Sequence, residues 1–359
     1  MSDLPLHLLV AFAGFGAGVA FGALAQRTNF CTMGAISDAV VMGDMRRLRA
    51  WVAAIAVALL GANALHAAGA IDLGKSIYLA PNLGWSGAVV GGAVFGFGMV
   101  LAGGCGQRSL VRAGAGNLKS WVVLILLGIS AYATLRGLVG AARVATWETT
   151  NLDLRRFGFA GQGLPELLTI PRMAIAAILG LALLAWCFKD REFRTSARDV
   201  AAGLGIGALI VAGWAITGIL GADDFEPTPL ASFTFVAPVG DALVYLMFWT
   251  GTKIAFGAAT VGGVILGAGL AAKASGTWRL ESFRDTSDFL RTATGAVMMG
   301  IGGVSALGCT VGQGLTGIST LAIGSFLALA GIVAGAVLAL KYLEEGSLAG
   351  ALKALAQRG

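Results

Sequence analysis

Long apolar runs separated by short polar segments make up most of the chain. Nine of them are expected to cross a lipid bilayer as helices: residues 5–25, 51–70, 84–103, 120–139, 170–188, 200–221, 252–272, 292–307 and 320–342. Four further apolar segments are too short to cross: residues 33–43, 106–117, 238–249 and 311–319. Because irregular backbone at membrane depth must be buried by protein or reached by water, we expect short broken or re-entrant helices there. The pattern predicts an all-α integral membrane protein.

The second half of the chain repeats the first. The stretch from Gly96 to Cys105 returns 204 residues later as Gly300 to Cys309, with Gly-x-Gly at its start and Gly-Cys at its end. One expected span, residues 170–188, separates four spans in each half. The halves therefore enter the membrane from opposite sides, which predicts inverted repeats. The predicted division is a first repeat at 1–140, a connecting loop and linker helix at 141–199, a second repeat at 200–345 and a cytoplasmic tail at 346–359.

The distribution of lysine and arginine predicts the orientation. Five segments on one side of the expected spans carry 17 of these residues: 43–50, 105–119, 189–199, 273–291 and the C-terminal end counted from Lys341. The acidic loop that holds Asp223, Asp224 and Glu226 falls on the other side. Since positive loops stay in the cytoplasm, we expect the N-terminus outside and the C-terminus inside.

Composition supports the membrane assignment and narrows the function. The chain is 57% hydrophobic and 12% charged, against roughly 25% charge in soluble proteins. Its net charge of +6 does not indicate a nucleic-acid partner, because the basic residues are confined to short loops. Four cysteines without a CxxC pair and two histidines give no metal-site spacing, so neither metal nor cofactor is expected. The sequence shows no P-loop and no evident signal peptide, and we expect a transporter, not an enzyme.

The doubled Gly-Cys stretch is the strongest candidate for function. Gly104-Cys105 and Gly308-Cys309 each lie where a span ends and a short helix is expected to begin. Helix N-termini expose N–H groups and attract anions, so an anion there would meet N–H donors and a thiol. Cys187 lacks a repeated counterpart and is interpreted as a packing residue.

Several polar residues near these cysteines have two interpretations. Gln107 and Gln313 either donate amide N–H groups to an anion or cap helices. Arg108 and Arg112 are interpreted first as inner-loop charges that set topology, and second as charges that draw an anion through. The matched pair Asp38 and Asp241 is interpreted as stabilising helix N-termini. The other role considered for that pair is proton transfer.

Cys31 is a third candidate, supported by its surroundings and not by the repeat. Its counterpart in the second half is expected near Leu220. It follows Arg27 and Asn29 at the end of a span, where polar groups are costly unless they face water or a substrate. Arg27 is equally well interpreted as a charge that reaches to the membrane interface.

Four motifs together resemble the YeeE/YedE family of sulfur-transport membrane proteins. They are Arg27-Thr-Asn-Phe-Cys31-Thr-Met-Gly-Ala, Gly103-Gly-Cys105-Gly, Ser232-Phe-Thr-Phe235 and Gly308-Cys309-Thr-Val-Gly-Gln313-Gly. The resemblance implies a nine-span inverted-repeat fold in the bacterial inner membrane, with Cys31, Cys105 and Cys309 lining a central route for thiosulfate. It also implies a possible small cytosolic sulfur-carrier partner of the TusA type.

The sequence therefore predicts uptake of thiosulfate along three thiols and helix N-termini. Polarizable thiols suit the soft terminal sulfur of this ion, and several weak sites in series allow it to leave. Transport of another sulfur or selenium compound is an alternative. A membrane thiol-disulfide oxidoreductase is a second alternative, although no quinone or haem site is evident.

Overall fold

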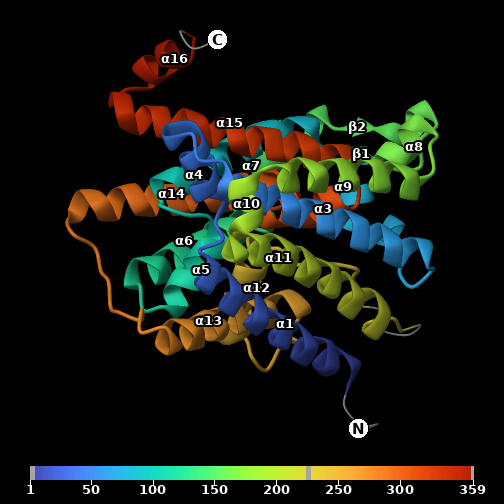
Figure 1. Cartoon of the computed structure of the whole chain (residues 1–359), viewed down its shortest axis with the longest axis horizontal. Coiled ribbons are helices and arrows are strands. Elements are labelled where there is room, and N and C mark those ends of the chain that lie inside the picture. Colours follow the sequence, from blue (N-terminus) through green and yellow to red (C-terminus); the bar gives the residue numbers. More distant parts are fainter. Residues whose placement is uncertain (1–4, 224–227, 357–359) are drawn as a thin grey trace.

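The computed structural model describes residues 5–223 and 228–356, and this part of the chain is almost entirely helical (Figure 1). Asp224 and Glu226 of the acidic loop and residues 357–359 of the tail lie outside the described residues. The described part holds one small sheet, in which β1 (Asn82–Leu83) pairs antiparallel with β2 (Leu152–Asp153). The protein is an all-α multi-pass membrane protein.

Nine helices coincide with the nine expected spans. They are α1 (Leu6–Thr28), α3 (Arg46–Ala67), α4 (Gly92–Leu101), α6 (Leu118–Leu135), α9 (Arg172–Lys189), α11 (Ala197–Ala215), α13 (Phe256–Ala274), α14 (Thr286–Ser305) and α15 (Ile323–Glu345). The shortest of them, α4, continues directly from the π-helical segment Gly87–Gly91. Within the described residues, all but α14 belong to the eight segments long and apolar enough to cross a membrane. Helix α14 begins inside the segment expected as a charged loop, because Asp285 caps it by accepting the Asp288 N–H at 2.8 Å.

The remaining elements are short. The α-helices are α2 (Thr32–Ser37), α5 (Gly106–Gly114), α7 (Leu138–Thr146), α8 (Leu164–Leu168), α10 (Arg191–Thr195), α12 (Ala237–Met247) and α16 (Leu348–Ala356). The π-helical segments are Asp38–Met42, Gly87–Gly91, Ile216–Leu220 and Gly312–Gly317. The 3₁₀ turns are Leu73–Lys75, Ile77–Leu79, Glu148–Thr150 and Leu154–Phe157. Helix α7 occupies part of the expected loop 141–169, which the polar composition of that stretch did not indicate.

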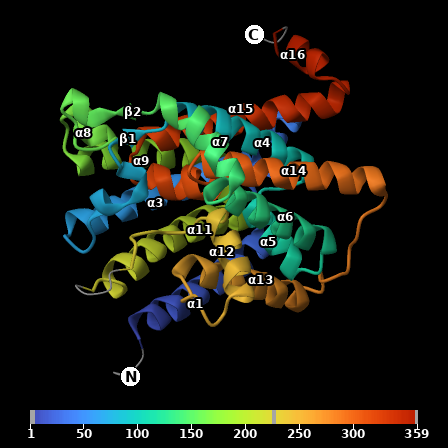
Figure 2. The same cartoon turned by 180° about the vertical axis from the view of Figure 1, so that it is seen from behind.

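The helices pair with an approximate twofold symmetry that relates the two halves. Helix α1 packs on α13, and its counterpart α11 packs on α3, the counterpart of α13. In the same way α4 packs on α15 and α14 packs on α6. Both views of the molecule place α1 and α13 along one edge and α15 along the opposite edge (Figures 1 and 2). Helices of each half therefore pack directly on helices of the other, and one hydrophobic core extends through both halves.

The equivalent helices α4 and α14 run in opposite directions. Gly98 of α4 approaches Gly295 of α14, while Gly91, earlier in the chain, approaches Gly302, later in the chain. Since the contact positions move in opposite senses along α4 and α14, these counterparts are antiparallel. The direction of this pair agrees with the expected inversion of the repeats.

Glycines allow the paired helices to come into backbone contact. A Cβ atom on Gly22 would lie 2.1 Å from the Val264 carbonyl oxygen, and one on Gly267 would lie 2.0 Å from that of Val19. At the α4–α15 interface a Cβ on Gly96 would lie 2.0 Å from the Ile332 carbonyl oxygen. These distances leave no room for any side chain, which explains the abundance of glycine in apolar runs.

Candidate functional site

The three candidate cysteines share one local geometry. Each precedes a short helix: Cys31 caps α2, Cys105 caps α5 and Cys309 immediately precedes the helical segment 310–319. The residue two positions earlier adopts the left-handed conformation in every case, namely Asn29 (φ 53°), Gly103 (φ 75°) and Leu307 (φ 57°). This turn stops the preceding helix and redirects the chain, so that each thiol lies at a helix N-terminus within the membrane region.

The cysteine sulfurs accept hydrogen bonds from the helices they begin. The Gly34 N–H donates to Cys31 Sγ at 3.4 Å, and the Gly312 N–H donates to Cys309 Sγ at the same distance. The Arg108 N–H faces Cys105 Sγ from the equivalent position. Because the Cys31 and Cys309 sulfurs act as acceptors towards the backbone, their S–H groups are available as donors to a ligand.

The thiols lie in one region where the two repeats meet. Cys105 and Cys309 are completely buried, whereas Cys31 is partly exposed. Cys105 lies close enough to Cys31 and Cys309 for electrostatic interaction, and the Thr310 hydroxyl reaches Cys105 from the other repeat. Cys187 lies apart, between α9 and α3, where its thiol donates to the Arg49 carbonyl at 3.3 Å.

Buried polar atoms without partners surround these thiols. Eleven such atoms form no hydrogen bond within the described residues, and five of them belong to the helical segments that begin at the three cysteines: Thr32 Oγ1, Gln107 Nε2, Arg108 Nη1, Thr310 Oγ1 and Gln313 Oε1. A buried polar atom left unpaired costs about 1–3 kcal/mol. Folded proteins rarely leave several such atoms in one place, so the cluster indicates a site that holds a polar ligand or water.

The two glutamines have different surroundings. The Cys105 thiol donates to Gln107 Oε1 at 3.9 Å, which leaves the Gln107 amide N–H groups for a ligand. The Gln313 amide instead donates to the Ala306 carbonyl and closes the turn before Cys309. The glycines keep room for these residues, since a Cβ on Gly308 would lie 3.2 Å from Gln313 Cγ. Likewise, a Cβ on Gly104 would lie 3.1 Å from Arg108 Cγ.

Two cavities are lined by the turns that precede the thiols. The larger has a volume of about 1100 Å³ and is lined by Gly103, Arg27 and Asn29, among others. Arg27 is exposed, and Asn29 accepts a hydrogen bond from Arg108 Nη2 at 3.1 Å. We call this larger cavity the basic vestibule. The smaller, of about 310 Å³, is bordered by Leu307, the counterpart of Gly103 in the second repeat.

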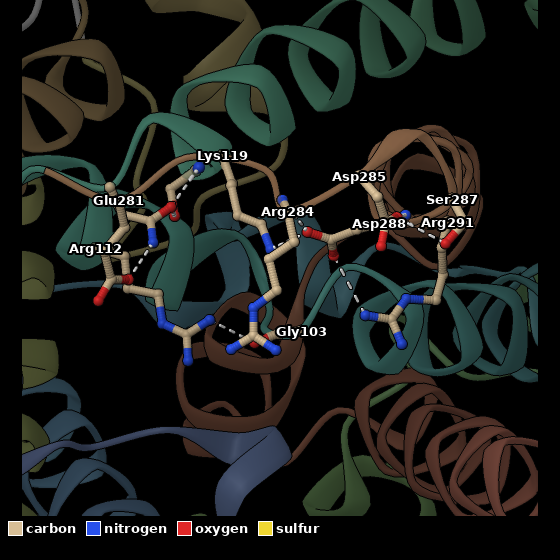
Figure 3. A network of polar contacts seen from close by, with 11 residues as sticks. Gly103, Arg112, Lys119, Glu281, Arg284, Asp285, Ser287, Asp288 and Arg291 are labelled. Carbon is tan, nitrogen blue, oxygen red and sulfur yellow. Dashed lines mark hydrogen bonds and ion pairs between the residues drawn. The ribbon is translucent and has the colours of Figure 1, made fainter.

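The basic vestibule unites residues from three of the five segments expected on the cytoplasmic side, 105–119, 189–199 and 273–291. Figure 3 shows its rim, where Lys119 pairs with Asp288. In the same view Arg112 donates to the Gly103 carbonyl at 2.8 Å. These three segments therefore lie on the same side of the molecule, and the positive-inside rule predicts a shared side for them.

Arg108 and the threonines are site residues whose position the sequence did not reveal. Arg108 lies on α5 beside Cys105, with only part of its side chain exposed, and is not a loop residue. Thr234 and Thr310 bring hydroxyls to the Cys309 and Cys105 sulfurs respectively. Threonine is so frequent in membrane helices that no sequence signal distinguishes these positions.

The second-half counterpart of Cys31 differs from the expected one. Helices α2 and α12 are equivalent by their aspartates, so the segment 232–236 before α12, and not Leu220, corresponds to Cys31. Phe233 anchors this segment by stacking on Phe21 with ring centroids 5.1 Å apart. The Phe235 N–H then faces Cys309 Sγ. The second half has 14 more residues between Thr217 and Asp241 than the first has between Thr28 and Asp38, and this insertion displaced the sequence alignment.

The expected role of the paired aspartates is wrong. Neither α2 nor α12 has an acidic residue in its first turn. Asp38 lies at the end of α2 and pairs with Arg47 at 3.2 Å. Asp241 lies within α12 and accepts a hydrogen bond from the Tyr132 hydroxyl of α6. Both carboxylates join elements laterally and do not stabilise helix ends.

Tyr78 adds a donor on the side of the smaller cavity. Its hydroxyl would lie 3.6 Å from a Cβ on Gly312, and it interacts electrostatically with Cys309. Burial raises the pKa of the Tyr78 phenol, so the hydroxyl stays protonated. An anion near Cys309 would therefore meet an O–H donor there.

Comparison with known proteins gives consistent results. Residues 27–338 match the model of a family described as sulphur transport. The chain is 27% identical over 326 residues to the thiosulfate transporter TsuA of Spirochaeta thermophila, covering 88% of this chain and 94% of that one. It is 28% identical over 318 residues to the TsuA of Escherichia coli, covering 84% and 86%. It is 31% identical over 188 residues to the probable transporter YedE of Escherichia coli, covering 51% and 42%.

Proposed function

Because the chain belongs to the sulphur-transport family, we propose that it takes up thiosulfate through the region between its two cavities. The observation that carries this proposal is the cluster of unpartnered buried polar atoms around three cysteines at helix N-termini. The two relatives that cover most of the chain are both named thiosulfate transporters.

The chemistry of the cluster suits thiosulfate in two respects. Its charge is compensated by backbone N–H groups and by four unpartnered side-chain atoms, which are Gln107 Nε2, Arg108 Nη1 and the hydroxyl oxygens of Thr32 and Thr310. Its soft terminal sulfur matches polarizable thiols, which donate weakly. Hydrogen bonds from Cys31, Cys105 and Cys309 in turn would hold the ion without trapping it.

We propose that the basic vestibule faces the cytoplasm and that the membrane is the bacterial inner membrane. The positive-inside rule supports this orientation, because the vestibule collects the arginine-rich segments. The N-terminus would then be periplasmic. The family resemblance further supports a small cytosolic sulfur-carrier protein of the TusA type as a partner.

Uptake of radiolabelled thiosulfate into liposomes that contain the purified protein tests the proposal. Wild type should accumulate label, whereas Cys31→Ala, Cys105→Ala and Cys309→Ala should each slow uptake by about tenfold, the effect of losing one hydrogen bond to a charged group. Cys187→Ala is the matched control, since its thiol donates to the Arg49 carbonyl and lies apart from the other three, and it should transport normally.

Equal uptake by all four variants at equal protein content would refute the thiol route. Competition then identifies the ion. If an excess of unlabelled sulfite or a selenium analogue suppresses uptake more strongly than unlabelled thiosulfate, the substrate is that other compound.

A further inference from the structure

The charges of the basic vestibule are unbalanced. Two carboxylates line it, Glu281 and Asp288. Eight cationic side chains also line it, namely Arg27, Arg108, Arg112, Lys119, Arg198, Arg279, Arg284 and Arg291. By contrast, the smaller cavity contains one arginine and one glutamate, Arg143 and Glu148, which pair with each other. The excess of positive charge is therefore a property of one end of the molecule.

Both carboxylates of the vestibule already have partners. Glu281 pairs with Arg279 at 2.7 Å and accepts the Asn117 amide at 2.8 Å. Asp288 pairs with Lys119, and with Arg291 at 3.4 Å. In the part of the chain that the structure describes, the other arginines of the vestibule form no ion pair, namely Arg27, Arg108, Arg112, Arg198 and Arg284.

Three of these arginines converge near the Gly103 turn. Arg108 keeps a buried Nη1 without a partner, and its Nη2 donates to Asn29. Arg112 is anchored by its bond to the Gly103 carbonyl, and Figure 3 shows its guanidinium and that of Arg284 directed to this same turn. Like charges held together in a partly enclosed space repel each other unless an anion lies between them.

We propose that Arg108, Arg112 and Arg284 form a second anion site, which binds divalent oxyanions through their oxygen atoms. Guanidinium groups present a planar pair of donors that matches the oxygens of such an ion. The site lacks thiols, so it does not depend on a soft sulfur and accepts sulfate as well as thiosulfate. It deepens the proposed function, because it would hold the transported ion after it leaves Cys31 and Cys105.

Binding of radiolabelled sulfate to the purified full-length protein in detergent tests the site. Chloride keeps the ionic strength constant, so that a diffuse cloud of counterions does not register as binding. Wild type should bind sulfate saturably. Arg284→Gln should weaken binding by about tenfold, and Arg112→Gln with Arg284→Gln should abolish it. Cys105→Ala should bind as wild type, because its thiol lies outside the site.

A matched control removes two charges elsewhere on the same face. Lys189→Gln with Arg194→Gln changes the net charge by the same amount at residues that do not line the vestibule, and should bind sulfate normally. Arg112 also supports the Gly103 turn, so Arg284→Gln alone, whose side chain is exposed, provides the test if the double variant misfolds. Arg112→Lys with Arg284→Lys should bind with intermediate strength, since charge is kept and the planar donors are lost.

Three results would overturn the site. They are no saturable sulfate binding by wild type, equal loss in the vestibule and control variants, and loss of sulfate binding in Cys105→Ala, which would place the ion at the thiols. The proposed function fails separately: if wild type binds sulfate but liposomes take up no thiosulfate, the site stands and the transport proposal does not.

Discussion

Replacing Thr310 by valine should stabilise the protein and weaken transport at the same time. Thr310 is completely buried, and its hydroxyl forms no hydrogen bond with any described residue, although the Cys105 sulfur lies beside it. Valine keeps the shape of the side chain and removes the polar atom. The two effects have opposite signs because the hydroxyl has no hydrogen-bond partner among the described residues and, in the proposed function, would donate to the passing ion.

The magnitudes follow from the cost of an unpaired buried hydroxyl. Removing it should raise the free energy of unfolding by about 1–3 kcal/mol. A hydrogen bond from a hydroxyl to a charged ligand contributes about 1.5–3 kcal/mol, so thiosulfate uptake at low concentration should fall by roughly tenfold or more.

Thermal unfolding in detergent and thiosulfate uptake into liposomes measure the two effects on the same preparation. Thr316→Val is the matched control. Thr316 is equally buried, but its hydroxyl donates to the Phe233 carbonyl at 2.7 Å. Removing that bond should destabilise the protein by about 1 kcal/mol. Since Thr316 has no unpaired oxygen, its loss should leave the affinity for thiosulfate unchanged.

The reasoning is refuted if Thr310→Val loses stability and transports normally. That result would mean that the hydroxyl is satisfied by a water molecule and plays a structural part. A variant that is more stable and also transports normally would separate the unpaired atoms from the path of the ion.

Two further predictions concern packing and pH. A Cβ on Gly335 would lie 2.0 Å from the Ala93 carbonyl oxygen, so Gly335→Ala should destabilise the α4–α15 interface by about 1–3 kcal/mol or abolish folding. Gly16→Ala is the control, because no atom lies within 4 Å of its Cβ, and it should leave the stability unchanged. Thermal unfolding measures both effects. The Asn117 amide holds the pKa of Glu281 below its usual range. The contact therefore stabilises the loop 275–285 fully above about pH 4.3, and this stabilisation is lost as the pH falls through the lowered pKa. Hydrogen exchange in that loop, corrected for the intrinsic rate, should rise on acidification in wild type and change less in Asn117→Ala.

The apolar pattern predicted the helices well because the bilayer imposes a length and a composition on each span. All nine expected spans and all four short segments coincide with helical elements. The boundary of α14 was missed, since Asp288 and Arg291 lie in its first two turns and resemble a loop. In the structure Asp288 is paired with Lys119, which removes the cost of placing it there.

The site was harder to predict because it depends on pairing in three dimensions. The Gly-Cys repeat indicated Cys105 and Cys309, and the polar ending of α1 indicated Cys31. No local signal shows that Thr310 of one repeat reaches Cys105 of the other, or that Arg108 is largely enclosed. The aspartates were misplaced for the same reason, since their partners Arg47 and Tyr132 lie on separate helices.

The interleaving of the repeats restricts how the molecule can move. A transporter whose halves tilt as rigid bodies needs an interface between them that slides. Here the first half contributes α1 and α4 to backbone contacts with α13 and α15 of the second, at glycines such as Gly22 and Gly96. Tilting one half would break both contacts together. We therefore expect the scaffold to stay still while an ion passes, with any motion confined to side chains and to the short helices that begin at the thiols.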